Sequence, residues 1–452
     1  MWFRNFLLSI GITLIGVAAS AQTLQTPQGH VFTYHHMPDA PRVAIAMAWK
    51  GGIGHLAKGK ENIMTFGPWL VTDGGSQDRS AADIRAEFEA MDSGAQLYTA
   101  PDAVRGFIVA PAQDLKRAVE IANEVLARPA LEDRWLQRFI RTRKAERAET
   151  EQQLWAQAWY AMRRLTMGDH PLRQAWSFEP LDNLDTLTGE DAQRWYDTSL
   201  GIDDLIIAAT GPADVDIVAN AIDIALSGLP TAHTRTATPP LDMAFSGKTI
   251  LIHRPTAQKS YVLVTGKLPG VTTPGDTGRE LAVGVLGYGD QSRLFTAIRK
   301  ELRGAYGFSA RKHGFTRAQD VLALQGEIDT KLLGEGLAAI EDTYTEFRTG
   351  GIGRLEFPFA KRFMVAEIKK NTAKPENQAY LMIEAALNGR NIGEGLDLLA
   401  RAQKLTRRDT NAQIKAEFPP YSKMLKIVVS PDRQAVVADC IITHFSEVGQ
   451  CR

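Results

Sequence analysis

The sequence has only two cysteines among its 452 residues, Cys440 and Cys451. Neither belongs to a Cys-x-x-Cys pair, which excludes the usual cysteine-based metal and redox motifs. Both lie close to the end of the chain, and two cysteines in an oxidising compartment normally pair. We therefore expect a Cys440–Cys451 disulfide that closes a short loop and holds the C-terminal tail in place.

An excess of charge is also missing, because 52 basic residues balance 52 acidic residues and no long basic run occurs. The sequence therefore gives no electrostatic reason to expect nucleic acid or an anionic membrane as a partner. After the N-terminal segment, no apolar run is long enough to span a bilayer. The hydrophobic share of 44% is that of an ordinary globular protein.

Familiar catalytic signatures are absent as well. The nine histidines form no His-x-x-Glu-His pair, and there is no Gly-x-Ser-x-Gly elbow, phosphate-binding loop or dinucleotide fingerprint. The adjacent His35 and His36 are expected on one strand, where neighbouring side chains point to opposite faces. We interpret them as residues of a strand end that faces solvent and not as a metal-binding pair.

The N-terminal segment has the form of a secretory signal peptide. Arg4 precedes an apolar run from Phe6 to Ala19, and "ASA" at 19–21 has the small-x-small form of a signal-peptidase site. Cleavage after Ala21 leaves Gln22 first, and not the cysteine that a bacterial lipid anchor requires. We expect a signal peptide over residues 1–21, a periplasmic protein and no membrane anchor after cleavage.

One pattern of strands and helices occurs twice. A short strand-like run that ends in His-x-Pro is followed by an apolar strand in "GHVFTYHHMP…RVAIAMAWKGG" and again in "GKTILIHRP…SYVLVTGKLPG". Gly29 and Gly247, which begin these stretches, are 218 positions apart. The sequences "LTGEDAQRWY" and "LTRRDTNAQI" recur at the same offset. Thr188 and Thr406 within them are the expected N-caps of two helices.

A further repeat defines the end of each copy. "DLIIAATGPADVDIVANAI" and "MLKIVVSPDRQAVVADCI" both predict a buried strand, a turn at Pro212 or Pro431, and an amphipathic helix. We therefore predict two homologous α+β halves, residues 22–230 and 245–452, joined by a Thr- and Pro-rich linker over 231–244. Each half should be a mostly antiparallel sheet packed with several helices.

One segment of the second half resembles a family signature. "SRLFTAIRKELRGAYGFSA", residues 292–310, reads as a helix that ends at Gly304 and is followed by Tyr306. It is similar to the C-terminal-half signature of the pitrilysin/insulinase-type zinc metallopeptidases, which include mitochondrial processing peptidase. That signature consists of S-R-L-F, I-R, a glycine turn and A-Y. Duplicated halves of this size are also the family's architecture. From the residues alone, Arg299 is a solvated residue beside an apolar helix face.

The zinc motif of that family, His-x-x-Glu-His on a helix of the first half, is degenerate in "NIMTFGPWLVTDGG". Thr65 and Trp69 stand at the histidine positions and Pro68 at the glutamate position. None of them offers an imidazole or a carboxylate, and Pro68 is expected to bend or break the helix. Glu146 matches the third ligand position, but a single carboxylate does not hold zinc.

The resemblance implies a division of roles between two chains. In some family members, one chain carries the zinc motif, and a homologous chain lacks it but supplies an Arg/Tyr pair that binds backbone carbonyls of the peptide. Arg299 and Tyr306 match that pair. We expect a non-catalytic, substrate-positioning subunit of a periplasmic heterodimeric zinc peptidase that acts on unfolded peptides. It should be inactive alone, with no cofactor on this chain and zinc on the partner.

Two other interpretations stay open. One is a catalytically inert structural or peptide-binding scaffold of the same fold, since relatives of this family are core subunits of respiratory complexes. The other is an active enzyme whose metal ligands are displaced to His35, His36 or His55. The identity of the partner chain also stays open, because either a homologous zinc-bearing chain or a second copy of this chain fits the resemblance.

Overall fold

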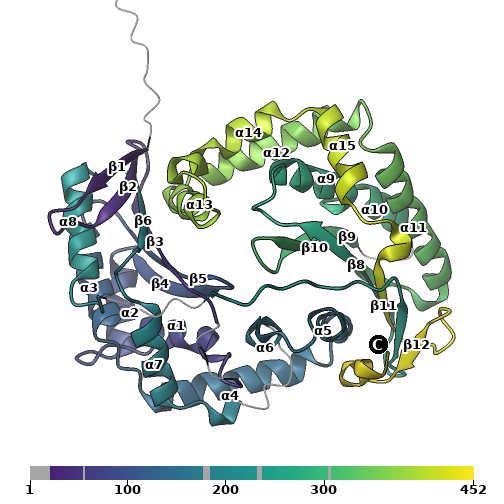
Figure 1. Ribbon diagram of the computed structural model, residues 1–452, viewed down its shortest axis with the longest axis horizontal. Coiled ribbons are helices and arrows are strands. Elements are labelled where there is room, and N and C mark those ends of the chain that lie inside the picture. Colours follow the sequence, from purple (N-terminus) through teal and green to yellow (C-terminus); the bar gives the residue numbers. More distant parts are fainter. Residues whose placement is uncertain are drawn as a thin grey trace, which may run out of the picture.

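Two six-stranded sheets, each covered by helices, lie on opposite sides of the molecule (Figure 1). The computed structural model describes residues 21–53, 56, 58–176, 184–231, 237–303 and 307–451. The predicted α+β fold with two similar halves is confirmed. The expected signal peptide before Ala21 and the centre of the expected linker, 232–236, lie outside the described residues. Within the described ranges, no helix has the length and apolar character to cross a membrane.

The first half contains the first sheet and the helices up to residue 226. Its strands, in sheet order, are β1 (Gln22–Gln25), β2 (Val31–His36), β6 (Ile206–Gly211), β3 (Val43–Lys50), β5 (Ala103–Ala110) and β4 (Gly94–Ala100). Its helices are α1 (Ile63–Asp73), α2 (Ala81–Ala90), α3 (Leu115–Ala127), α4 (Asp133–Thr150), α5 (Leu154–Met167), α6 (Pro171–Trp176), the short η1 (Leu184–Thr186), α7 (Gly189–Ser199) and α8 (Val215–Leu226).

The second half repeats this order from residue 249. Its sheet runs β12 (Cys440–Ile442), β7 (Thr249–His253), β11 (Leu425–Ser430), β8 (Ser260–Pro269), β10 (Gln319–Ile328) and β9 (Phe308–Gly314). Its main helices are α9 (Asp276–Gly287), α10 (Arg293–Phe295), η2 (Thr296–Glu301), α11 (Leu333–Gly350), α12 (Glu356–Thr372), α13 (Pro375–Leu387), α14 (Leu398–Lys404) and α15 (Arg407–Glu417). The short turns are η3 (Thr330–Leu332), η4 (Ile392–Asp397), η5 (Tyr421–Lys423) and η6 (Phe445–Cys451).

The repeat holds for the helix starts but fails at the end of the chain. Thr188 and Thr406 cap α7 and α15 by accepting from the N–H of Asp191 and Asp409, as predicted. The amphipathic helix predicted after Pro431 is wrong, because the chain there passes through turns and bends and then forms β12. Strand β12 pairs in parallel with β7 and takes the outer position that β1 occupies, antiparallel to β2, in the first sheet. The segment thus pairs with the open edge of β7, although the local sequence pattern of the segment predicts a helix.

Strand β3 is buried on both faces, and its two faces carry side chains of different size. Val43, Ile45, Met47 and Trp49 face the core under the helices of the first half. Ala44, Ala46 and Ala48 alternate with these residues along the strand and belong to a separate core on the other face of the sheet. An all-alanine face lets a helix approach the sheet closely, because no long side chain stands between the two backbones.

The helix that covers the alanine face comes from the other half. Ala379, Met382 and Ile383 of α13 pack on it, and α13 lies against the first sheet in Figure 1. In return, α5 of the first half covers the second sheet, where Tyr160 and Met162 share a core with the inner faces of β7, β8 and β11. Each sheet therefore depends on a helix from the opposite half to bury its second face.

Polar contacts strengthen this exchange. The hydroxyl of Thr210, which is fully buried in β6, donates to the carbonyl of Pro375 at the start of α13, at 2.7 Å. Arg317, between β9 and β10, pairs with Asp102 of the first half and with Glu384 of α13, the latter at 3.0 Å. Burial alone would lower the pKa of Arg317, but the hydrogen bond and charge of Asp102 raise it above its ordinary value.

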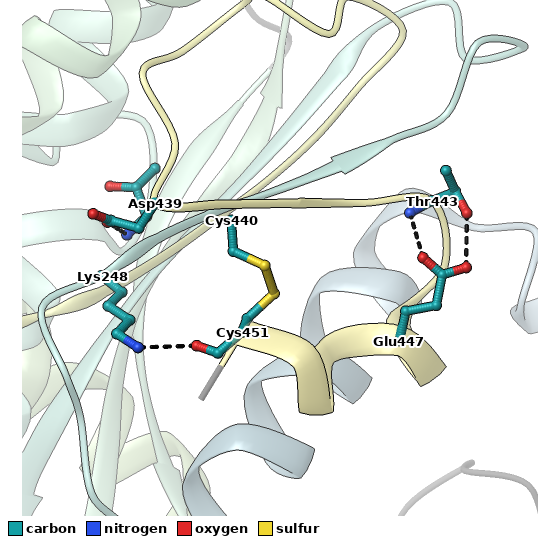
Figure 2. The surroundings of a disulfide bond; sticks show 7 residues. Lys248, Asp439, Cys440, Thr443, Glu447 and Cys451 are labelled. Atoms are coloured by element: carbon teal, nitrogen blue, oxygen red, sulfur yellow. Dashed lines mark hydrogen bonds between the residues drawn. A yellow bond between two sulfur atoms is a disulfide. The ribbon is translucent and has the colours of Figure 1, made fainter.

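The C-terminal tail closes over α5 (Figure 2). Cys440 and Cys451 form a disulfide that joins β12 to η6. Lys248 donates to the carbonyl oxygen of Cys451 at 3.0 Å, so the tail is also tied to the start of β7. On its inner side, the ring of Phe445 packs edge-on against Tyr160 of α5, with centroids 4.9 Å apart. The disulfide thus stabilises a contact between the two halves as well as the tail itself.

Loss of the disulfide should destabilise the whole protein. Cys440→Ser with Cys451→Ser should lower the free energy of unfolding by about 2–3 kcal/mol, because the unfolded chain regains the freedom of the open loop. Urea unfolding with and without reductant measures the effect. The chain has no other cysteine, so reductant should destabilise the native protein and leave the double variant unchanged. Equal unfolding midpoints for the native protein under both conditions would contradict the prediction.

Candidate functional site

Helix α1 contains the three residues of the degenerate motif and runs without interruption from Ile63 to Asp73. Thr65 is half-buried, Pro68 is buried and Trp69 is exposed at 36%. The helix packs on β4, α4 and α7. The expectation that Pro68 breaks the helix is wrong, and the reason lies outside the helix.

Proline normally disrupts a helix because its missing N–H leaves the carbonyl four residues earlier without a partner. For Pro68 that carbonyl belongs to Met64. In this protein the hydroxyl of Thr99, on β4, donates to the carbonyl oxygen of Met64. The hydrogen bond that the helix loses is therefore replaced by one from the sheet, and α1 continues through the proline.

Trp69 fills the second histidine position with a packed aromatic ring. Its indole contacts Phe66 and, on α4, Phe139, with ring centroids 6.1 and 5.6 Å apart and both pairs edge-on. Glu146, two turns after Phe139 on α4, is exposed and pairs with Arg143 at 3.5 Å. The position of the third ligand thus belongs to a surface ion pair.

These residues do not fit a zinc ion. Zinc in proteins takes nitrogen, sulfur or carboxylate ligands in a close tetrahedral set, whereas α1 offers a hydroxyl, a proline ring and an indole. In the ranges that the structure describes, no three histidine, cysteine, aspartate or glutamate side chains are grouped closely enough to hold a metal. Of the alternative ligands, His35 and His36 lie on β2, and His55 is outside the described residues.

The signature segment of the second half begins with one α-helical turn, α10, and continues as the π-helical turn η2. The N–H of Leu302 donates to the carbonyl of Ala297, five residues back, at 3.0 Å. Leu294 and Ile298 are fully buried, and Arg299 is exposed on the opposite side. π-Helical turns are rare and often occur at functional sites. Tyr306, like Gly304, lies outside the described residues.

A neighbouring arginine, missed by the reasoning from sequence, holds this segment in place. Arg293 donates to both carboxylate oxygens of Glu356 on α12, at 2.9 and 2.7 Å, and to the carbonyl of Gly351 at 2.8 Å. The hydrogen bond to Glu356 is the main cause that raises the pKa of Arg293. Burial would raise the pKa of Glu356, but Arg293 and the N–H of Gly353 lower it below its usual value. Arg293 and Glu356 are 63 positions apart, so a local sequence pattern does not predict that they pair.

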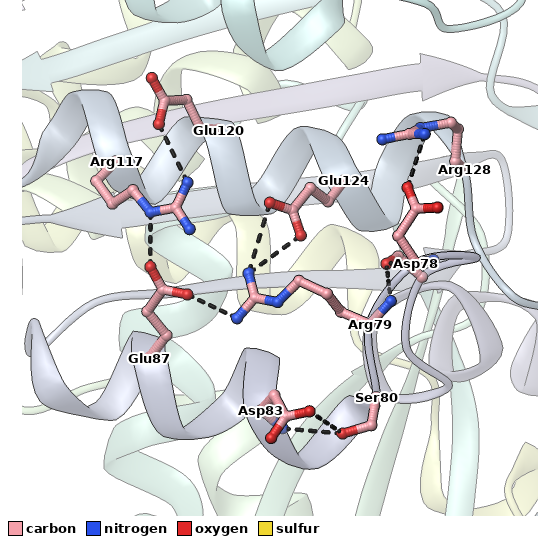
Figure 3. A network of polar contacts seen from close by, with 10 residues as sticks. Asp78, Arg79, Ser80, Asp83, Glu87, Arg117, Glu120, Glu124 and Arg128 are labelled. Carbon is pink, nitrogen blue, oxygen red and sulfur yellow. Dashed lines mark hydrogen bonds and ion pairs between the residues drawn. The ribbon is translucent and has the colours of Figure 1, made fainter.

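In the first half, helix α2 takes the place of α10 and η2 and is held differently. Figure 3 shows Arg79 between two carboxylates, Glu87 on α2 at 2.6 Å and Glu124 on α3 at 3.1 Å. Arg117 of α3 also donates to Glu87, and its hydrogen bond is the main cause that lowers the pKa of Glu87. A network joins α2 to α3, whereas one bidentate pair joins α10 to α12.

The chain leaves η2 through a strained residue, because Arg303 has a positive φ of 56°. A residue other than glycine in this left-handed region is strained by roughly 1–2 kcal/mol. The expected helix end at Gly304 lies outside the described residues.

The two pieces of the candidate site lie far apart within one chain. Helix α1 is on the first-half side of the molecule, and α10 is on the outer side of the second half (Figure 1). Thr65, Pro68 and Trp69 lie on α1, which contacts α4, the helix that contains Glu146, and the structure does not bring Arg299 to them.

Comparison with known proteins agrees with this architecture. The family model described as "Peptidase M16 inactive domain" matches residues 186–364. Residues 186–364 are therefore similar to the M16, or pitrilysin/insulinase-type, peptidase family. The match covers the end of the first half and the part of the second half that contains the Arg299 segment.

Solved structures share the fold of this chain at low sequence identity. A peptidase M16 inactive domain from Pseudomonas fluorescens superposes with a TM-score of 0.79 at 16% identity, covering 92% of this chain and 99% of that one. The first half of the periplasmic protease PqqL from Escherichia coli has a TM-score of 0.69 at 14% identity, covering 95% and 96%.

A curated human protein, cytochrome b-c1 complex subunit 1, mitochondrial, is 21% identical over 217 residues. The aligned part is 48% of this chain and 45% of that relative, so the match spans about half the length of each.

The rescue of Pro68 by Thr99 can be tested with a double-mutant cycle. Thr99→Val should cost about 1–2 kcal/mol of stability, because it leaves the buried carbonyl of Met64 without a donor. In the Pro68→Ala background the same change should cost clearly less, because the new N–H at position 68 bonds Met64. Urea unfolding of the four proteins measures the coupling. Equal costs in both backgrounds would show that Thr99 does not replace the missing helix bond.

The strain at Arg303 gives a second prediction. Arg303→Gly should raise the free energy of unfolding by about 0.5–1 kcal/mol, because relief of the left-handed strain exceeds the added freedom of the unfolded chain. Arg354→Gly is the matched control, since Arg354 is exposed and is not among the residues with positive φ. The control should be neutral or destabilised. If both variants lost stability to the same degree, Arg303 would carry no strain.

Proposed function

We propose that this chain is the non-catalytic, substrate-positioning subunit of a periplasmic heterodimeric zinc peptidase. A homologous chain with an intact His-x-x-Glu-His motif supplies the zinc and cleaves the peptide. Arg299 and Tyr306 of this chain hydrogen-bond backbone carbonyls of the unfolded substrate. The guanidinium suits this role because it keeps its charge at all relevant pH values and offers five donors in a fixed plane.

The observation that carries the proposal is the contrast between the two pieces of the site. Helix α1 is fully folded but has Thr65, Pro68 and Trp69 at the positions of the catalytic residues. The second-half segment keeps its signature, and Arg293 and Glu356 anchor it so that Arg299 is presented to solvent. Because α1 and α10 lie on different sides of the chain, Arg299 requires a second chain to meet an active zinc site.

The periplasmic location rests on the N-terminal segment and on the likeness to a periplasmic protease. Residues 1–21 have the form of a signal peptide. The structural neighbour from Escherichia coli is named as a periplasmic protease. A Cys440–Cys451 disulfide also suits an oxidising compartment.

A second candidate function is a scaffold subunit without a link to proteolysis. The likeness to a subunit of the human cytochrome b-c1 complex favours it. The two proposals differ in what a purified pair of chains does. A substrate-positioning subunit increases peptide cleavage by its zinc-bearing partner, whereas a scaffold binds its partner and leaves added peptide intact.

The test is reconstitution with the zinc-bearing homologue, using an unstructured fluorogenic peptide. This chain alone should bind no stoichiometric zinc and should cleave nothing. Arg299→Ala with Tyr306→Phe should lower kcat/KM of the mixture by about tenfold or more, the loss expected for hydrogen bonds to a bound peptide. Arg408→Ala, at a 90% exposed arginine, should have no effect. Full activity of the double variant would refute the role of the pair, and zinc bound to this chain would refute the division of roles.

A further inference from the structure

Helix α12 has an unusual distribution of apolar residues. Only Phe357 is fully buried among its residues. Leu355 at its N-cap is 92% exposed, and Phe359 and Phe363 are 55% and 50% exposed. These three positions are spaced by four residues, so they lie on one face of the helix. An amphipathic surface helix normally turns such a stripe towards the core, whereas α12 turns it towards solvent.

Tyr288, at the end of α9, extends this face. Its side chain is 54% exposed, and its ring centroid lies 6.4 Å from that of Phe363. We call Tyr288, Leu355, Phe359 and Phe363 the α12 patch. Contiguous exposed apolar side chains of this kind are uncommon on monomers and usually mark an interaction surface.

Two arginines flank the α12 patch. The guanidinium of Arg311, on β9, lies over the ring of Tyr288, 5.6 Å from its centroid. Arg362 is exposed on α12, three residues after Phe359 and so on the same side of the helix. Within the described part of the chain, neither arginine has a carboxylate at ion-pair distance. Exposed aromatic rings beside arginines have the composition of binding hot spots.

Arg293 is a nearby arginine whose charge is satisfied within this chain. Arg293, at the other side of the start of α12, is held by both oxygens of Glu356. In the first half, Arg79 contacts Glu87 and Glu124. The partner that complements Arg311 and Arg362 therefore has to bring its own carboxylates, and the rings between them require apolar side chains.

We propose that the α12 patch, with Arg311 and Arg362, is a docking site for an acidic and apolar peptide segment of another protein. Carboxylates of the segment bind the two guanidinium groups, which favour planar two-oxygen acceptors. Leucine or phenylalanine side chains of the segment cover Phe359, Phe363 and Tyr288. This site uses none of residues 292–310 and requires neither zinc nor cleavage.

The test uses a labelled synthetic peptide of about 15 residues in which glutamates alternate with leucine and phenylalanine, a length typical of docked segments. Fluorescence anisotropy measures its binding to the full-length native protein. The same peptide with glutamine in place of glutamate should bind at least tenfold more weakly. Binding of the acidic peptide should weaken as salt rises, because exposed charge pairs are screened. Equal binding of the two peptides would overturn the proposal.

Two chemically different variants locate the site. Phe359→Ser with Phe363→Ser removes the apolar face, and Arg311→Glu with Arg362→Glu reverses the charge. Each double variant should bind the acidic peptide at least tenfold more weakly. Arg433→Glu, at an exposed arginine outside the patch, should bind like the native protein. Since all four changed side chains are exposed, the thermal unfolding midpoint should stay unchanged. Unaltered binding by both double variants would refute the site.

The other possible occupant is a second copy of this chain, and sedimentation velocity separates the two cases. If the patch binds a partner peptide, copies of the purified protein should not associate through this surface. The native protein and the variant Arg311→Glu with Arg362→Glu should then sediment identically. A concentration-dependent dimer that this double variant abolishes would identify the patch as a self-interface and overturn the proposal.

Discussion

The exchange of α5 and α13 between the halves is the constraint on which the rest of the structure depends. Each sheet has one face covered by its own helices and the other covered by a helix from the opposite half. A sheet with an uncovered apolar face is unstable in water, so neither half can complete its core alone. The alanine face of β3, the buried hydrogen bond from Thr210 and the disulfide-bonded tail all act on these two crossed helices. Together they make two homologous units into one folded body.

This body also fixes the distance between the parts of the site. Helix α1 lies on the first sheet and the Arg299 segment lies beside the second, and the crossed helices hold the two sheets in place. In α1, the ring of Trp69 contacts Phe139 of α4. The hydroxyl of Thr99 donates to the carbonyl oxygen of Met64, the carbonyl that Pro68 leaves without a partner in the helix. The first half thus contains aromatic and hydrogen-bonded packing contacts at this point, whereas the second half presents Arg299 to solvent.

Two expectations from sequence were wrong, and each for the same physical reason. Pro68 does not break α1, because a hydroxyl from β4 replaces the missing hydrogen bond. The segment after Pro431 forms a strand instead of a helix, because β7 offers an open edge. In both cases a residue's local preference is overridden by packing or by a partner that is distant along the chain.

The sequence by itself determined the duplication, the α+β class, the helix caps at Thr188 and Thr406, and the absence of histidine and glutamate from positions 65, 68 and 69. These features depend on residue type and on spacing within a few residues, which local patterns record directly. The tertiary structure alone decided which helix covers each sheet, that Arg293 anchors the Arg299 segment through Glu356, and that α12 turns its aromatic face to solvent. Those outcomes arise from contacts between residues far apart in the chain. The apolar pattern of a helix predicts that one of its faces is covered, and only the tertiary structure determines which residues cover that face.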